Sequence, residues 1–254
     1  MDFFFREYGQ GEPIIILHGW LGISDHWIPV GKFLASQGYH VLIPDLPNHG
    51  KSFHTEDFSF DEAASIIQCF CKAKELKKPI LLAHSMGGKI AMQMINQNPN
   101  YFKSLILVDV HFHKNKRTPF NQLLSFLLIQ TDISKFSNIS EFKDYFLKKG
   151  IDKQWVAVLL KNLDYKGSTL KWKSNIPMLA KEIDKILEGV EVTKTNIPTL
   201  LIRGENSNYV KDEDCISFKE KFPNSTIVSV PNSGHWVQVD NPTFFLKEVM
   251  DFLE

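Results

Sequence analysis

A serine between small residues is the position in this chain whose surroundings best fit covalent chemistry. Residues 83–88 read Ala-His-Ser-Met-Gly-Gly; an apolar, strand-like run precedes them and a helical pattern follows. A sharp strand-to-helix turn exposes the serine hydroxyl, requires small neighbours, and offers the free N–H groups of a helix N-terminus to an oxyanion. Ser85 is therefore predicted to be a nucleophile. Ala83 stands where this turn usually has glycine, and its single extra methyl group is expected to be tolerated.

The serine requires a base, because free serine is a weak nucleophile at neutral pH. Nine histidines compete for this role. His235 follows the last predicted strand and comes last in the chain, which is the order serine, acid, histidine that accompanies such a turn. We predict that His235 is the base. His18, His49 and His84 lie in or beside tight turns and are predicted to be structural.

Two carboxylates could orient this histidine. Asp109 ends the apolar run 105–108, which is expected to lie beside the serine strand, and Glu205 follows a later strand. A carboxylate on a neighbouring strand end can hold the imidazole and stabilise the imidazolium that forms in the reaction. The order Ser85, Asp109, His235 favours Asp109, and Glu205 remains the alternative.

Two backbone amides are expected to bind the oxyanion. Met86 directly follows the serine and supplies one N–H group. Trp20 lies in the loop after the first buried strand, which commonly supplies the other.

A metal site is not indicated. His111 and His113 flank Phe112 shortly after Asp109, but no third and fourth ligands follow at the spacing of a zinc site. Neither a metal nor another cofactor is predicted.

Alternating strands and helices must position these residues. Strands are expected at 3–8, 14–17, 41–44, 80–83, 105–108, 199–202 and 227–230, and helices at 26–37, 60–74, 88–96, 212–221 and 242–253. Continuous apolar runs are typical of strands buried on both faces of a parallel sheet. The pattern predicts the α/β class, with a mostly parallel central sheet flanked by helices.

The alternation breaks between residues 111 and 191. Helical faces at 120–129, 141–149, 154–163 and 178–187 occupy this segment. Such an insertion is expected to form a cap over the carboxyl ends of the strands, where open α/β sheets bind ligands. We predict a core of residues 1–110 and 192–254 and a helical cap of residues 111–191. Its aromatic residues, among them Phe142, Phe146 and Trp155, either line an apolar pocket or, more simply, fill the cap's own core.

Composition limits the partners and the compartment. With 29 basic and 29 acidic residues, no net charge favours nucleic acid or an anionic membrane. Three cysteines fit a reducing compartment. The N-terminal residues lack the pattern of a secretory leader, and no apolar run reaches the roughly 18 residues of a membrane span. A cytoplasmic location is expected, and the oligomeric state is left open.

Several short motifs are distributed along almost the whole chain. They lie at 18–22 (His-Gly-Trp-Leu-Gly), 45–52 (Asp-Leu-Pro-Asn-His-Gly-Lys-Ser), 84–89 (His-Ser-Met-Gly-Gly-Lys), 108–110 (Val-Asp-Val), 170–175 (Leu-Lys-Trp-Lys-Ser-Asn), 203–209 (Arg-Gly-Glu-Asn-Ser-Asn-Tyr) and 234–235 (Gly-His). Together they resemble the α/β-hydrolase superfamily, and within it the small esterases similar to the bacterial YbfF esterase. The resemblance implies a cap inserted after the sixth strand. It also implies activity on short-chain carboxylic esters, with thioesters as a further class.

The resemblance also bears on the acid. Most enzymes of this fold carry it shortly after the glycine that follows a later strand, where this chain has Ser207. The YbfF-like esterases instead place it after the sixth strand, which corresponds to Asp109. The chain departs from these relatives at Ala83 and at residues 110–112, where they more often have a branched residue, a small residue and proline. The second departure leaves cap entry and substrate preference open.

Three functions fit these residues. The leading hypothesis is a serine esterase that acts on a small-molecule ester and forms an acyl-enzyme on Ser85. The second is a carbon–carbon bond hydrolase or lyase of the same fold; such enzymes usually need a cation such as arginine in the pocket, and the predicted cap contains a single arginine, Arg117. The third is a hydrolase-like ligand receptor with slow turnover, which the same residues also fit.

Overall fold

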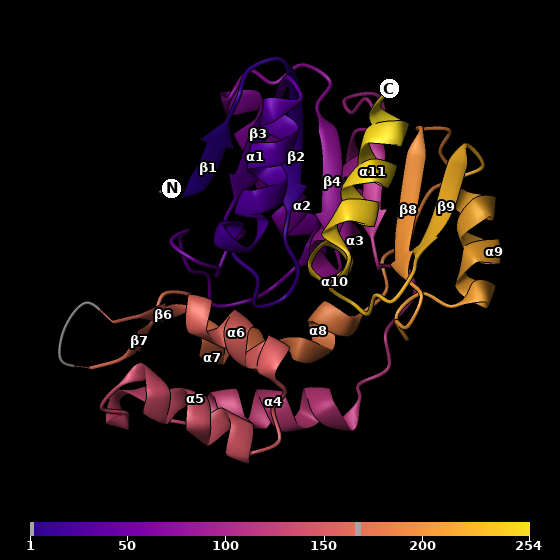
Figure 1. Ribbon diagram of the computed structural model, residues 1–254. Helices are drawn as coiled ribbons and strands as arrows, with labels where there is room; N and C mark the ends of the chain where they lie inside the picture. The colour runs from indigo at the N-terminus through magenta and orange to yellow at the C-terminus, as the bar shows by residue number, and fades with distance from the viewer. Residues whose placement is uncertain (1–2, 166–168) are drawn as a thin grey trace.

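The computed structural model describes residues 3–165 and 169–254 (Figure 1). Within these ranges the strands of the central sheet are β1 (Phe5–Tyr8), β2 (Glu12–Leu17), β3 (Tyr39–Pro44), β4 (Ile80–His84), β5 (Leu105–Val108), β8 (Thr199–Gly204) and β9 (Ser225–Val230). The helices that flank it are η1 (Ser24–Trp27), α1 (Ile28–Ser36), α2 (Phe60–Ala73), α3 (Met86–Gln97), α9 (Asp212–Lys221), α10 (Val237–Asp240) and α11 (Pro242–Leu253).

The sheet has the strand order β1-β3-β2-β4-β5-β8-β9. β1 is antiparallel to β3, and the other neighbouring strands are parallel. The predicted α/β class, with a mostly parallel sheet flanked by helices, is confirmed. The strand before the insertion, β5, is the fifth along this chain and not the sixth, because a single edge strand, β1, precedes β2.

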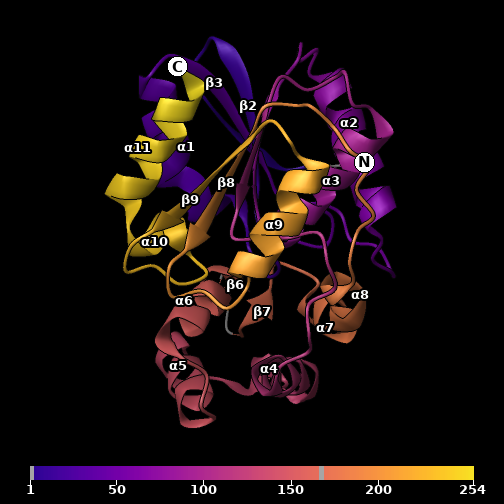
Figure 2. The ribbon, with the colours of Figure 1, turned by 90° about the vertical axis from the view of Figure 1, so that its right-hand side faces the viewer.

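Alternate side chains of the strands pack into two cores. Ile14 and Ile16 of β2 face the core formed with α1 and α11, whereas Ile15 and Leu17 face the core formed with α2, α3 and α9. Figure 2 shows these two helical layers on opposite sides of the sheet. Because successive strand residues point to opposite faces and all four side chains are fully buried, a slip of one residue would exchange the two cores.

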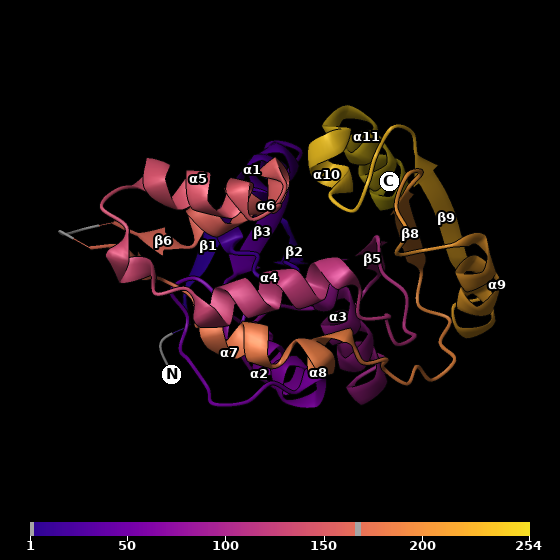
Figure 3. The same cartoon turned by 90° about the horizontal axis from the view of Figure 1, so that it is seen from below.

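Between β5 and β8 the chain leaves the sheet and forms a helical insertion beside the carboxyl ends of the strands (Figures 1 and 3). Its elements are α4 (Pro119–Gln130), η2 (Ile133–Lys135), α5 (Ile139–Lys148), α6 (Lys153–Lys161), the hairpin of β6 (Leu163–Asp164) and β7 (Lys171–Trp172), α7 (Ile176–Lys181) and α8 (Ile183–Leu187). Among the described residues, no helix has both the length and the apolar character to cross a membrane.

Two of the predicted helices are each divided in the structure. The helix expected at 26–37 is a 3₁₀ turn, η1, followed by α1, and Pro29 lies in the first turn of α1, where a proline is tolerated. The helix expected at 178–187 is two helices, because Glu182 ends α7 and precedes α8.

Candidate active site

A strained turn carries Ser85 from β4 into α3. Ser85 has φ 53° and ψ −122°, a conformation that side-chain-bearing residues rarely adopt and that costs on the order of 1–3 kcal/mol. Its N–H donates to the carbonyl of Val108 in β5 at 3.1 Å, which ties the turn to the neighbouring strand. The chain therefore makes the sharp strand-to-helix turn that the sequence predicts.

The glycines of this turn are required by close packing. A Cβ atom on Gly87 would lie 2.5 Å from the carbonyl oxygen of His18, and one on Gly88 would lie 2.4 Å from Cγ1 of Val110. Ala83, in contrast, is fully buried and does not have a positive φ. Alanine is therefore compatible with this turn in place of glycine.

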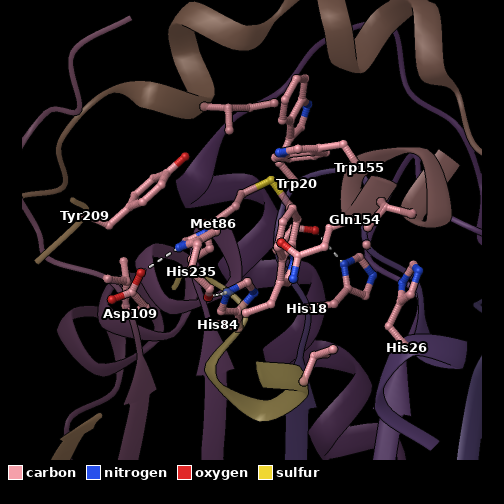
Figure 4. A pocket seen from close by; sticks show the side chains of 18 of the residues that line it. His18, Trp20, His26, His84, Met86, Asp109, Gln154, Trp155, Tyr209 and His235 are labelled. Atoms are coloured by element: carbon pink, nitrogen blue, oxygen red, sulfur yellow. Dashed lines mark hydrogen bonds and ion pairs between the residues drawn. The ribbon is translucent and has the colours of Figure 1, made fainter. Parts of the chain in front are cut away.

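A chain of hydrogen bonds connects Ser85 to a carboxylate. His235 Nδ1 lies 2.7 Å from Asp109 Oδ2 (Figure 4). On the other side of the ring, His235 Nε2 lies 3.0 Å from Ser85 Oγ. Because an ionised carboxylate only accepts hydrogen bonds, Nδ1 carries the proton and Nε2 is free to accept one from the serine. The structure brings together the three residues that the sequence singles out.

Asp109 is fully buried and surrounded by donors. In addition to the histidine, the Gly204 N–H donates to Oδ1 at 3.2 Å and the Ser207 hydroxyl donates to Oδ2. These bonds offset the cost of burying the carboxylate. Glu205, the alternative acid, instead accepts a hydrogen bond from the Asn232 N–H at 3.0 Å. The structure thus places Asp109, and not Glu205, against the imidazole.

Tyr209 holds one face of the imidazole, a contact that the sequence analysis does not predict. Its ring stacks on that of His235 with centroids 3.8 Å apart and planes inclined by 18°. Burial, with the nearby Asp109, raises the pKa of the tyrosine, so its ring stays neutral. The preceding Gly234 N–H donates to Asp240 Oδ2 at 2.8 Å and fixes the loop that carries the histidine.

The expected oxyanion donors lie in the segments that meet at the serine. Met86 is the first residue of α3, so its N–H has no partner within the helix. The loop before Trp20 passes close to the nucleophile, since a Cβ atom on Gly19 would lie 3.0 Å from Ser85 Cβ. Trp20 donates its indole N–H to the carbonyl of Leu179 at 3.1 Å, and both Trp20 and Met86 line the cavity (Figure 4).

Two further histidines brace the site in their neutral forms. His18 accepts a hydrogen bond from the Leu46 N–H at Nε2 (3.0 Å) and donates from Nδ1 to the Gly19 carbonyl (2.9 Å). Burial lowers the pKa of His18 to about 3. His84 lies 2.9 Å through Nε2 from the carbonyl oxygen of His235, and burial together with His235 lowers its pKa well below the ordinary value. These contacts match the structural roles predicted for both residues.

A cavity of about 240 Å³ extends from Ser85 between the end of the sheet and the insertion. Its lining is mainly apolar and comes from both parts, with Trp20, Met86, Val110 and Trp236 from the core and Trp155, Val158, Ile183 and Ile186 from the insertion. Trp155 packs against Trp20 and Trp236, with ring centroids 5.7 and 4.9 Å apart. Phe142 and Phe146 are fully buried in the hydrophobic core, as the simpler interpretation expects.

His111 and His113 lie in the segment that follows Asp109. His111 lines the cavity and accepts a hydrogen bond from the His113 N–H at 3.0 Å. No group of three or more His, Cys, Asp or Glu side chains within the described residues could hold a metal ion.

The family model described as the alpha/beta hydrolase fold matches residues 12–130. The mouse protein named sn-1-specific diacylglycerol lipase ABHD11 is 31% identical over 251 residues, which cover 94% of this chain and 80% of the relative. The chain belongs to the α/β-hydrolase family. A solved structure of a marine microorganism esterase is 33% identical, with a TM-score of 0.94 and 99% coverage of both chains.

Relatives of this α/β hydrolase include an acyltransferase. Ethanol acetyltransferase 1 of Cyberlindnera jadinii is 25% identical, with alignment over 95% of this chain and 79% of the relative. The lipase and the esterase are more similar to this chain than this acetyltransferase is, and the prediction of a carboxylic ester hydrolase is confirmed at the level of enzyme class.

Proposed function

We propose that this protein is a serine hydrolase that cleaves small carboxylic esters through an acyl-enzyme on Ser85. The observation that carries the proposal is the continuous hydrogen-bonded chain from Asp109 through His235 to Ser85, which ends in a mainly apolar cavity. Residues 111–191 act as a cap on a core of residues 1–110 and 192–254, because the insertion supplies the wall opposite the sheet.

The reaction begins when His235 Nε2 takes the proton of Ser85 Oγ and the oxygen attacks the ester carbonyl. The N–H groups of Trp20 and Met86 stabilise the resulting oxyanion. His235 then gives its proton to the departing alcohol, and an acyl-enzyme remains. Water, activated by the same imidazole, releases the acid and restores the serine. Asp109 stays ionised throughout and stabilises the imidazolium.

The cavity and the relatives support this substrate class. Its apolar lining fits an acyl chain, and its volume favours a small one. The names of the relatives, a lipase, an esterase and an acetyltransferase, all describe reactions of an acyl group. Thioesters belong to the same proposal because they react through the same acyl-enzyme.

The other two hypotheses have less support. No arginine lines the cavity among the described residues, and of the two lysines that do, Lys89 has its ammonium group bound to three protein oxygens. The exposed Lys161 is then the cation that could bind a carboxylated substrate for carbon–carbon cleavage. A ligand receptor with slow turnover could have the same triad. It would differ from the proposed esterase only in how fast it turns over an ester.

Replacement of the nucleophile tests the proposal. Ser85→Ala should lower kcat for p-nitrophenyl acetate and butyrate by at least about 10³-fold, because it removes the atom that is acylated. Ser65→Ala, in the exposed part of α2, is the matched control and should leave kcat unchanged. A fluorophosphonate should add to the wild-type protein and not to the Ser85 variant, as read by intact mass. Full turnover by the Ser85 variant would refute the proposal, and tight ester binding without turnover by the wild type would favour the receptor.

A further inference from the structure

Lys89 is a buried cation that the proposed reaction does not use. It lies one helical turn after Ser85 on α3, with 2% of its surface exposed. Its Nζ donates to Asn115 Oδ1 at 2.9 Å and to the carbonyl oxygens of Leu187 at 3.2 Å and Glu188 at 2.5 Å. An ammonium group has three N–H donors, so these bonds use all of them. The side chain is therefore occupied in holding protein atoms together.

The three acceptors lie where the chain passes between the core and the insertion. It leaves through residues 111–115 and returns through residues 187–190, and we refer to these two segments as the neck. Backbone bonds join them, from the Asn115 N–H to the Leu187 carbonyl and from the Val190 N–H to the Phe112 carbonyl, both 2.8 Å. Lys89 therefore binds both segments of the neck to the helix that starts at the nucleophile.

Close packing leaves little freedom in the neck. A Cβ atom on Gly189 would lie 2.9 Å from the Lys114 backbone nitrogen and 3.0 Å from the Phe112 carbonyl oxygen. The neck also has an exposed ion pair between Lys114 and Glu188. An exposed pair contributes little, whereas carbonyl groups that lose a buried donor are costly. The buried lysine, and not the exposed one, is the strong tether.

The same tether fixes one wall of the cavity. Ile183, Ile186 and Leu187 of α8 line the cavity, and the last carbonyl of α8 is among the groups that Lys89 binds. A cation at a helix C-terminus also stabilises the end of that helix. Burial lowers the pKa of Lys89 to about 8, opposed by Glu188, so the side chain is mostly charged at neutral pH.

We propose that Lys89 is a positioning residue that sets the acyl-chain specificity of the enzyme, because its clamp on the neck holds the α8 wall at a fixed distance from Ser85. The inference rests on the proposed ester hydrolysis. An acetyl group is too short to depend on a distant wall, whereas a hexanoyl group gains its binding energy from apolar contacts along its length.

The experiment measures KM and kcat for p-nitrophenyl acetate and hexanoate, which share the leaving group. Lys89→Met should raise KM for the hexanoate about tenfold and leave both constants for the acetate within about twofold. Lys114→Met, which alters the same neck at its exposed ion pair, is the matched control and should change neither ester. An unchanged hexanoate KM, or an equal loss for both esters, would overturn the inference.

A milder variant covers the case in which Lys89→Met does not fold. Asn115→Ala removes one of the three acceptors, leaves the lysine in place and should give a smaller change of the same kind, about threefold in the hexanoate KM. No change with this folded variant would also count against the clamp. The Ser85→Ala variant separates the two proposals. If it retains ester turnover, the proposed reaction fails. If turnover depends on Ser85 but Lys89→Met affects both esters equally, only the role of Lys89 is refuted.

Discussion

The loops at the ends of the strands and the inserted helices enclose the same cavity, but they are held in different ways. The loops are bound from within: His18 and Asp109 are fully buried, and each is hydrogen-bonded to backbone groups of the core. The insertion reaches the core through a mixture of contacts: some are buried, such as the bond from Asn162 Nδ2 to the Leu21 carbonyl at 2.8 Å, and some are exposed, such as that from Gln154 Nε2 to Asp240 Oδ1 at 2.9 Å.

This difference separates two tasks within one site. Groups that must transfer a proton need positions fixed to within fractions of an ångström, which a buried hydrogen-bond network provides. A wall that contacts an apolar chain must lie at the right distance but needs no exact alignment of single atoms, because dispersion and apolar burial depend weakly on direction. We therefore expect changes in the loops to affect kcat or stability, and changes in the insertion to affect KM.

The strongest test of this division is at the buried carboxylate. Asp109→Asn should lower kcat by about 10⁴-fold, because an amide in this place allows the wrong tautomer of His235 to form. Glu205→Gln is the matched control and should change kcat by less than about threefold. If instead the asparagine variant is active and the glutamine variant is not, Glu205 is the acid and the assignment is wrong.

Acid should weaken the core through its buried histidines. Burial lowers the pKa values of His18 and His49 to about 3, below the ordinary 6.5, so between these values the unfolded chain binds protons that the native protein does not. The contribution of these neutral histidines to the free energy of unfolding is fully present above about pH 6.5. It falls toward pH 3 by about 1.4 kcal/mol per pH unit for each such histidine.

Urea unfolding at a series of pH values measures this slope. His49→Gln should make it shallower, and the exposed His54→Gln should not. The histidines of residues 111–191 are His111 and His113, both in the neck, so the helices of the insertion contribute no comparable slope. An equal slope in the His49 variant and the wild type would contradict the expectation.

On the other side of the cavity, the Trp155 ring of the insertion packs on Trp20 and Trp236. Trp155→Ala removes this apolar part of the cavity wall. We expect KM for p-nitrophenyl butyrate to rise about tenfold, with kcat changed less than about threefold. A fall in kcat that approaches the effect of Asp109→Asn would show that the insertion also positions the reacting groups, and the division of tasks would not hold.

The smallest effect is expected at Ser207. Its hydroxyl is one of three donors to the Asp109 carboxylate, and the other two remain in Ser207→Ala. Loss of one hydrogen bond of about 1 kcal/mol should lower kcat about fivefold. Steady-state kinetics at saturating ester measures it, and a loss as large as that of Asp109→Asn would mean that the serine has a direct part in the reaction.

Much of the fold follows from local sequence signals. The observed bounds of β5, α9 and α11 coincide with the predicted ones, because each has a clear signal: a continuous apolar run, acids in a first turn, or a proline at the helix start. The hairpin of β6 and β7 could not be predicted, since strands of two residues show no periodicity. The break at Glu182 also lacks a glycine or proline signal.

The candidate site was predictable where its residues lie in a local pattern. Ser85 is embedded in its own turn motif, and His235 follows a strand in the expected order. The roles of Tyr209 and Lys89 arise only from contacts between distant segments, the tyrosine ring with the imidazole and the ammonium with the neck. Single-sequence patterns contain no information on such contacts, although both residues lie within motifs that the resemblance rests on.

The hydroxyl of Ser207 reaches the Asp109 carboxylate from the end of another strand, β8. Two strand ends therefore meet at a single carboxylate, and position 207 is the place where most members of the superfamily carry the acid. A carboxylate at either position would lie beside the other, so an acid at position 207 instead of 109 would need no change in the register of β5 and β8.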